Sequence, residues 1–214
     1  MQEVENWRRW FDRKELTTNW LGSEINHWFP SLAHLKNLDC QILEVGSYEG
    51  RSAIAFLEYL PRCHLTAIDI FVDPEVERRF DRNMAPYGDR VTKIKNRGLA
   101  AMDAMFRKRQ FDAIYLDTGK RRELTFANAA IAWSLLSEGG VLIFDDLAWG
   151  EGNASKDRPH DAIWLFCLAF ESCIEYLHEG KQMIVKKVAE WPAMPGVEKI
   201  STRHRSSTPT GGHD

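Results

Sequence analysis

Residues 42–60 read ILEVGSYEGRSAIAFLEYL. Their first part belongs to a short apolar run, 40–45, that is typical of a buried strand, and 50–59 has the character of a helix. Gly46, at the end of the strand, allows a ligand to approach the backbone, and Gly50 opens a helix whose free N–H groups attract negative charge. The stretch therefore predicts a strand, a ligand-binding loop and a helix in direct succession.

The alternation of strand and helix continues along the chain. Short runs rich in Ile, Val and Leu, each bounded by polar or glycine-containing turns, fit buried strands at 40–45, 64–70, 91–96, 111–117 and 140–146. Helices are expected between them, at 50–59, 75–84, 99–108 and 121–136. This order predicts right-handed crossovers and an α/β, doubly wound, mainly parallel sheet.

The C-terminal part breaks this pattern. A loop rich in Gly, Asn and Asp, 149–158, precedes a predicted helix at 159–172. Two apolar runs, 174–177 and 182–188, follow so closely that they predict an antiparallel hairpin. We therefore expect a seven-stranded, Rossmann-like sheet that ends in this hairpin.

The residue pattern of 121–136 also predicts which side of this helix faces the sheet. Its expected packing stripe consists of Leu124, Ala127, Ala130, Ile131, Ser134 and Leu135. The pair Gly139 and Gly140 is expected to stop this helix.

The two ends of the chain differ from the middle. Residues 1–38 are expected to form a helical flank, 39–189 the main domain, and 190–214, rich in Ser, Thr, Pro, Gly and His, a disordered tail. The flank carries four tryptophans: Trp7, Trp10, Trp20 and Trp28. They could form a lid over a substrate, but packing of the flank onto the domain is the favoured interpretation.

Composition limits the possible functions. The chain has 214 residues, of which 44% are hydrophobic and 28% charged, as expected for one globular domain. A net charge of −3 gives no electrostatic case for nucleic acid or an anionic membrane as partner. The first residues do not resemble a signal peptide, and no apolar stretch is long enough to span a membrane. We expect a cytoplasmic protein in which Cys40, Cys63, Cys167 and Cys173 are reduced core residues.

The loop after the first strand departs from the dinucleotide-binding pattern. That pattern requires GxGxxG, whereas here Ser47 is followed by the bulky Tyr48 and a single further glycine. Asp69 ends the second predicted strand, where a carboxylate can accept hydrogen bonds from both hydroxyls of a ribose. The alternative to a ligand-binding site is that the loop binds no ligand and that Asp69 is an ordinary helix cap.

Three aspartates follow two further strands. Asp117 ends the fourth, and Asp145 and Asp146 end the fifth, so the three carboxylates are expected to converge at one edge of the sheet. Carboxylates gathered in this way favour a divalent cation, which would orient an acceptor hydroxyl and promote loss of its proton. Lys120 is near enough to act as a base if the same cation favours its neutral form. The alternative, which the sequence leaves equally open, is that Asp145 and Asp146 only cap the strand and the loop and that Lys120 is solvated.

The chain resembles the class I S-adenosylmethionine-dependent methyltransferases, and among them the family that is described as the methyltransferase domain family. The resemblance extends from about residue 19 to 188. It rests on the segment quoted above and on LTAIDIF (65–71), FDRNM (80–84), FDAIYLD (111–117) and GGVLIFDDLAW (139–149). It implies S-adenosylmethionine as cofactor, bound by Glu44, Gly46, Ser47, Gly50, Asp69, Gly98 and Asp117.

One departure from the family pattern concerns the chemistry. The fourth strand of the family usually ends Asp-Gly-Ser-His, whereas this chain has Asp117-Thr118-Gly119-Lys120. An Asp-x-x-Lys followed by an acidic pair is similar to metal-dependent catechol- and caffeoyl-type O-methyltransferases, in which the lysine is the base. Sugar O-methyltransferases also gather aspartates at these strand ends. The resemblance thus implies Lys120 and Asp145 as catalytic residues and Mg²⁺ at Asp117, Asp145 and Asp146.

A second departure is Gly98, in the loop where the family often has Ser and adenine binds. Contacts to adenine at this position would come from the backbone.

The leading hypothesis is O-methylation of a small molecule or sugar. A non-catalytic S-adenosylmethionine-binding protein is an alternative, because the lysine in place of the family's histidine is consistent with lost activity. An NAD-dependent oxidoreductase is less favoured, because the Gly46 loop lacks the dinucleotide pattern. The sequence indicates neither the acceptor nor the oligomeric state.

Overall fold

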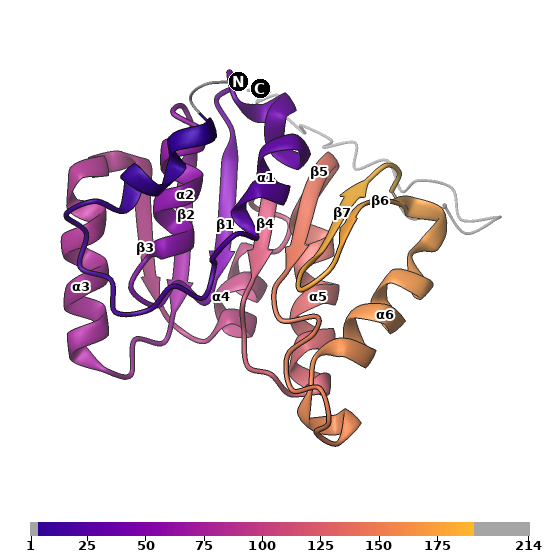
Figure 1. Cartoon of the computed structure of the whole chain (residues 1–214). Coiled ribbons are helices and arrows are strands. Elements are labelled where there is room, and N and C mark those ends of the chain that lie inside the picture. The colour runs from indigo at the N-terminus through magenta and orange to yellow at the C-terminus, as the bar shows by residue number, and fades with distance from the viewer. Residues whose placement is uncertain (1–3, 191–214) are drawn as a thin grey trace, which may run out of the picture.

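The computed structural model describes residues 4–190, which form a seven-stranded sheet in the order β3-β2-β1-β4-β5-β7-β6 (Figure 1). The strands are β1 (Gln41–Val45), β2 (His64–Asp69), β3 (Val91–Lys95), β4 (Phe111–Leu116), β5 (Leu136–Phe144), β6 (Ile174–Glu179) and β7 (Met183–Lys187). Strands β1 to β5 pair in parallel, and β7 is antiparallel to both β5 and β6. The predicted α/β, mainly parallel sheet with a C-terminal antiparallel hairpin is confirmed.

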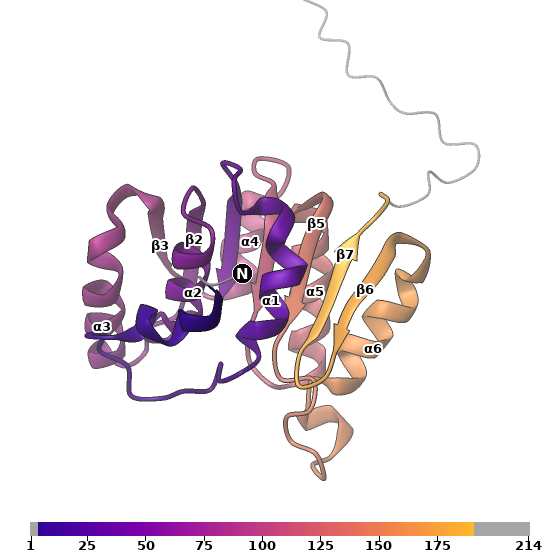
Figure 2. The same ribbon diagram turned by 45° about the horizontal axis from the view of Figure 1, so that its top comes forward.

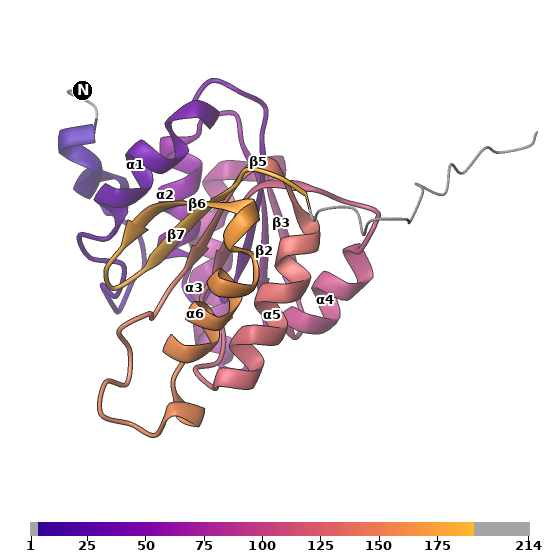
Figure 3. The same cartoon turned by 90° about the vertical axis from the view of Figure 1, so that its right-hand side faces the viewer.

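Helices cover both faces of the sheet. The α-helices are α1 (Ile25–Leu32), α2 (Arg51–Tyr59), α3 (Pro74–Met84), α4 (Gly98–Met105), α5 (Arg122–Leu135) and α6 (His160–Ala169). Short 3-10 helices are η1 (Val4–Phe11), η2 (Ala33–Leu35), η3 (Ala85–Arg90), η4 (Ser155–Asp157) and η5 (Glu171–Cys173). The buried clusters place α1, α2 and α3 on one face of the sheet and α4, α5 and α6 on the other. Figure 3 shows α1 and α2 on the opposite side from α4 and α5.

Each face of the sheet has its own aromatic core. On the first, Trp28 of α1 stacks on Phe56 of α2 with ring centroids 4.6 Å apart and contacts Tyr115 of β4. On the second, Trp133 of α5 packs edge-on against Phe166 of α6. Full burial of each large apolar side chain stabilises the fold by about 1.5–3 kcal/mol, so these clusters hold the helices, and the loops that precede them, in place.

The predicted packing side of α5 was only partly right, since Leu135 is buried and Ile131 packs against the core, but three of the six residues of the stripe are exposed. The buried residues of this helix are Thr125, Asn128, Ala129, Ala132, Trp133 and Leu135, whereas Leu124, Ala130 and Ser134 are exposed. Both sides of the helix are rich in alanine, so periodicity did not distinguish them. The large indole of Trp133 decides the orientation, because it fills the space against α6.

The glycine pair does not end α5. The helix ends at Leu135 and the chain enters β5 at once, with Gly139 and Gly140 inside the strand. Gly139 has a φ of +82°, and the register between β4 and β5 shifts in this part of the strand. The glycines therefore belong to a bulge, where a positive φ favours glycine.

The N-terminal flank is less helical than predicted, since 12–24 is an irregular segment between η1 and α1. Trp7 and Trp28 are buried and Trp10 packs against the same core, as the packing interpretation expects. Figure 2 shows α1 in front of the sheet, between β1 and β5. Trp20 differs, because its side chain is 70% exposed.

Three further predictions concern the cysteines, membrane-spanning segments and the chain end. All four cysteines are free and buried. Within residues 4–190, no helix has the length and apolar character to cross a membrane. The predicted disordered tail lies outside the described residues, apart from its first residue, Glu190.

Candidate cofactor and acceptor site

The loop after β1 lies where three parallel strands end together. The Gly46 N–H donates to the carbonyl of Ile68 at 2.8 Å, and the Asp117 N–H donates to the carbonyl of Val45 at 2.9 Å. Gly46 has a φ of +96°, and a Cβ there would lie 1.8 Å from the carbonyl oxygen of Asp117. Since β1 stands between β2 and β4, this is the switch point at which α/β sheets bind ligands.

Asp69, at the end of β2, holds this loop in shape. Its carboxylate accepts hydrogen bonds from the N–H groups of Tyr48 at 2.9 Å and Phe71 at 2.8 Å. Both of these residues have positive φ, 48° and 42°, which costs free energy for a side chain of their size. The carboxylate thus offsets local strain at the position for which the sequence predicts ribose binding.

A cleft of about 230 Å³ lies beside Asp69. It is lined by Val45, Gly46, Ile68, Asp69, Ile70, Asn96, Gly98, Asp117, Thr118 and Gly119. Four of the residues predicted to bind the cofactor, Gly46, Asp69, Gly98 and Asp117, therefore share one cleft. Asn96 was not foreseen from the sequence, since nothing distinguishes it from an ordinary strand-end residue.

Replacing Asp69 by Ala is expected to weaken binding of S-adenosylmethionine by about 10- to 150-fold. The loss of a hydrogen bond to a charged group, about 1.5–3 kcal/mol, sets this range. Calorimetric titration would measure it, with Asp89→Ala as control, because Asp89 is an exposed aspartate that does not line the cleft. An unchanged dissociation constant for Asp69→Ala would exclude the ribose role.

Glu44 and Gly50 lie behind the loop rather than on the cleft surface. The Glu44 carboxylate is fully buried, and neither oxygen has a hydrogen-bond partner within the described residues. Burial raises the pKa of Glu44 to about 7, although the nearby Ser47 and Ser52 hydroxyls act in the opposite direction. Gly50, with a φ of +88°, precedes α2 and packs against α3, so its contribution is to the shape of the loop.

The raised pKa of Glu44 predicts a pH-dependent stability. The folded chain holds the Glu44 proton more tightly than the unfolded chain. The protonated carboxyl therefore adds to the free energy of unfolding in full below pH 4.5, and this contribution is lost as the pH rises through about 7. The loss amounts to roughly 3 kcal/mol at most, because a tenfold difference in proton affinity between the two states corresponds to about 1.4 kcal/mol. Urea unfolding of the cofactor-free protein at pH 5 and pH 8 should show a smaller pH effect for Glu44→Gln than for the wild type. The exposed Glu138→Gln serves as control, and an equal pH effect in all three proteins would refute the prediction.

The segment 12–24 covers the other side of the loop. The buried Glu49 carboxylate accepts hydrogen bonds from the N–H and hydroxyl of Thr17, at 2.6 and 2.8 Å, and forms an ion pair with Arg79 at 2.9 Å. Arg51 donates to the carbonyl of Thr18 at 2.8 Å. A small cavity of about 40 Å³ remains between this segment and the loop. Its lining residues are Leu16, Thr18, Trp20, Leu21, Gly46, Ser47, Tyr48, Glu49, Arg51, Ser52, Tyr115, Asp117 and Asp145.

The structure brings Asp117, Asp145 and Asp146 together: one carboxylate oxygen of each lies within 4.8 Å of the others. Lys120 forms an ion pair with Asp117 at 2.7 Å and a second with Asp146. Lys120 is therefore not simply solvated. Burial raises the pKa of Asp117; Lys120 lowers it and Asp145 raises it.

Asp145 has two partners that sequence reasoning missed. The Tyr115 hydroxyl donates to one oxygen at 2.6 Å, and the Gln182 amide donates to the other at 2.9 Å. Gln182 in turn accepts from the indole N–H of Trp28 at 2.8 Å. These contacts join β4, the hairpin and α1 at one carboxylate. No short sequence motif could predict them, because the residues are far apart in the chain.

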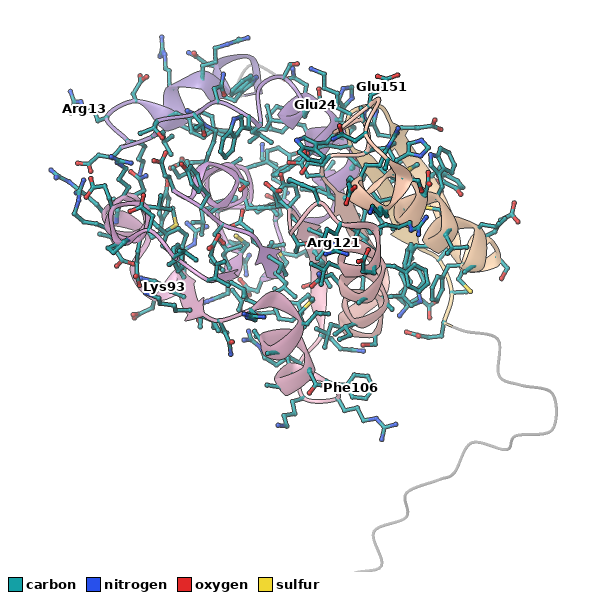
Figure 4. All side chains as sticks on the ribbon, turned by 90° about the horizontal axis from the view of Figure 1, so that it is seen from below. Arg13, Glu24, Lys93, Phe106, Arg121 and Glu151 are labelled. Carbon is teal, nitrogen blue, oxygen red and sulfur yellow. The ribbon has the colours of Figure 1, made fainter. Side chains whose placement is uncertain are left out.

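A larger cavity, of about 600 Å³, opens over the aspartates. Its lining residues are Trp20, Glu24, Asp117, Lys120, Asp145, Asp146, Ala148, Trp149 and Lys181. Figure 4 views the molecule from below and labels Glu24 from the N-terminal segment and Glu151 from the loop after β5. Asp117 lines this cavity, the small one and the cleft beside Asp69, so the three are contiguous around one residue.

Comparison with protein families gives one match, to a methyltransferase domain over residues 43–147. No curated protein sequence matches this chain.

Solved structures share the fold at low sequence identity. MycE, a methyltransferase of the mycinamycin biosynthetic pathway in complex with Mg and SAH, has a TM-score of 0.63 at 16% identity. The match covers 86% of this chain and 53% of MycE, so the chain spans about half of that protein. A second structure, with Mg, SAH and mycinamycin VI, has a TM-score of 0.61 at 17% identity, with 86% and 53% of the two chains covered. A candidate O-methyltransferase from Klebsiella pneumoniae has a TM-score of 0.64 at 17% identity over 88% of this chain and 89% of its own.

Proposed function

We propose that this chain, a class I S-adenosylmethionine-dependent methyltransferase, methylates a hydroxyl oxygen of a small molecule or sugar. The observation that carries the proposal is the position of Asp117, which lines both the cofactor cleft and the large cavity over the aspartates. An acceptor in that cavity would lie next to a methyl group presented from the cleft.

The residues of the cleft fit the cofactor. Gly46 lines the cleft and lets the loop pack directly against the backbone of Asp117, where a Cβ would collide, and Asp69 presents a carboxylate to the cleft where a ribose would bind. The orphaned Glu44 carboxylate lies beneath the loop, where it adds negative charge that favours the amino group of the cofactor. When bound, S-adenosylmethionine supplies a methyl group on a positively charged sulfur, which is already reactive.

The chain itself has to orient the acceptor and remove its proton. We assign the proton to Lys120 Nζ, which accepts it as the neutral amine and becomes the ammonium that pairs with Asp117 and Asp146; the residue also lines the acceptor cavity. The oxygen–methyl bond then forms as the methyl–sulfur bond breaks, and the electron pair of that bond stays on sulfur. Asp145, held by Tyr115 and Gln182, is assigned to orient the acceptor hydroxyl.

The three aspartates also fit a divalent cation. Each offers a hard oxygen, the oxygens are close enough to converge, and each carboxylate has lone pairs beyond those that its present hydrogen bonds use. Asp117, Asp145 and Asp146 would hold Mg²⁺, which would supply positive charge that promotes loss of the acceptor proton. The ammonium of Lys120 competes for two of these carboxylates, so ion binding and the position of Lys120 are linked.

The walls of the acceptor cavity indicate the class of acceptor. Trp20 and Trp149, whose side chains are 70% and 43% exposed, both line the cavity. The three aspartates and Lys120 line it as well. Exposed indoles bind flat rings by stacking, and carboxylates bind vicinal hydroxyls. A ring that carries adjacent hydroxyls, as in a catechol or a sugar, matches both features. The net charge of −3 gives no support for a nucleic acid acceptor.

Turnover with a panel of acceptors tests the proposal. The purified chain is incubated with S-adenosylmethionine and catechols, phenols with a single hydroxyl, or sugars, and formation of S-adenosylhomocysteine is measured with Mg²⁺ or with a strong chelator. We expect turnover with a vicinal diol acceptor and at least a tenfold loss with chelator, since ion stabilisation of a forming oxyanion contributes several kcal/mol. Cofactor binding without turnover on any acceptor would support the non-catalytic alternative. Binding of NAD in place of S-adenosylmethionine would overturn the proposal.

A further inference from the structure

A second group of metal-binding side chains lies at the edge of the acceptor cavity, away from the three aspartates. Glu24 immediately precedes α1, His27 lies in the first turn of that helix, and His178 lies in β6. One potential ligand atom of each lies within 4.8 Å of the others. The two imidazole rings stack with centroids 3.6 Å apart and planes 14° from parallel.

Local structure brings these side chains together. Residues three apart share one face of a helix, which places Glu24 above His27. In β6 the register against β7 shifts between Tyr176 and His178, and such a bulge redirects the side chain that follows it. Gly180 provides the space beside the ring, because a Cβ there would lie 2.7 Å from Nε2 of His178.

Within the described part of the chain, the three side chains have no other polar partners. Among residues 4–190, none of them forms a side-chain hydrogen bond or an ion pair, and Nε2 of His178 is buried without a hydrogen-bond partner. The carboxylates of Asp145 and Glu49, by contrast, accept hydrogen bonds at both of their oxygens. A buried ring nitrogen without a partner costs free energy, and coordination of a cation removes that cost.

We propose that Glu24, His27 and His178 bind a divalent transition-metal ion of the zinc class, which joins the N-terminal segment to the edge hairpin. Two imidazole nitrogens and one carboxylate are a ligand set suited to Zn²⁺ or Co²⁺, whereas Mg²⁺ prefers oxygen alone. The ion would bind independently of the aspartate cluster, which offers only oxygens.

The position of the ion links it to the acceptor cavity. Glu24 and Trp20 both line that cavity, and Trp28, one turn after Glu24, reaches Asp145 through Gln182. An ion between α1 and β6 would therefore hold together the helix that carries Trp28 and the hairpin that carries Gln182, and through Glu24 it would reach the segment that carries Trp20.

The test uses the untagged full chain, freed of metal with a chelator that is then removed. Calorimetric titration with Zn²⁺ should show one ion bound per chain, and Co²⁺ should give visible absorption bands of a nitrogen-ligated ion. His27→Gln and His178→Gln should each weaken binding at least about tenfold, the loss caused even by removing a group that supports a metal ligand. The controls His64→Gln, an exposed histidine outside the cluster, and Asp146→Asn, in the aspartate cluster, should stay within about threefold of the wild type.

Unchanged Zn²⁺ affinity in His27→Gln would overturn the proposal, and because His27 is exposed, this variant should fold normally. Loss of Zn²⁺ binding in Asp146→Asn with retention in His178→Gln would place the ion at the aspartates and also overturn it. No methyl transfer is involved in these measurements, so their outcome is independent of the proposed enzymatic function.

Discussion

Gly46→Ala is expected to abolish measurable binding of S-adenosylhomocysteine and to lower the Tm of the cofactor-free protein by about 8–20 °C. The added Cβ would lie 1.8 Å from the carbonyl oxygen of Asp117, a backbone atom that cannot rotate away. Forcing β1 and β4 apart costs about 3 kcal/mol, and a φ of +96° adds about 1–2 kcal/mol for alanine. Each kcal/mol corresponds to roughly 2–4 °C in a chain of this size.

Gly139→Ala is the matched control, because Gly139 has a similar φ of +82° but no atom within 4 Å of the added Cβ. Alanine at this position has the conformational cost of a positive φ, but its Cβ does not collide with another atom. Its Tm should fall by about 2–8 °C, and its affinity for S-adenosylhomocysteine should be unchanged. Calorimetry and thermal melting of both variants separate the two effects. Near-normal ligand affinity in Gly46→Ala would show that the loop after β1 is not the cofactor site.

The order of strands and helices was predictable because it depends on local patterns. Every predicted strand is present to within a few residues, since runs of Ile, Val and Leu between turns reflect burial on both faces of a parallel sheet. The failures arose where tertiary contacts decide. The packing side of α5 depends on the fit of Trp133 between helices, and the role of Gly139 depends on a bulge against β4.

The candidate site divides in the same way. Asp69 ends β2, and Asp117 and Asp145 directly follow β4 and β5. Because the carboxyl ends of parallel strands meet at one edge of the sheet, this convergence could be predicted from the sequence. Tyr115, Gln182 and Glu49 could not, because their partners come from elements far apart in the chain. The exposed Trp20 was noted as a possible lid residue, but its exposure was decided by the ties of segment 12–24 to Glu49 and Arg51.

Lys120→Met is expected to lower kcat by about 10²- to 10⁴-fold, the usual contribution of a general base, and to change cofactor affinity by less than about threefold. Lys120 lines the acceptor cavity but not the cofactor cleft, so its loss should affect chemistry rather than cofactor binding. Steady-state assays with the best acceptor of the panel measure kcat, and calorimetry measures cofactor affinity.

Lys120→Arg distinguishes a base from a purely electrostatic role. Arginine keeps the positive charge that pairs with Asp117 and Asp146, but its guanidinium does not lose a proton in proteins. If Lys120 removes the acceptor proton, both variants lose kcat to a similar degree. Lys181→Met is the matched control, because Lys181 lines the same cavity without pairing with the aspartates, and it should affect acceptor KM more than kcat. Wild-type kcat in Lys120→Arg would show that Lys120 contributes charge alone, and the base would have to be sought elsewhere around the acceptor cavity.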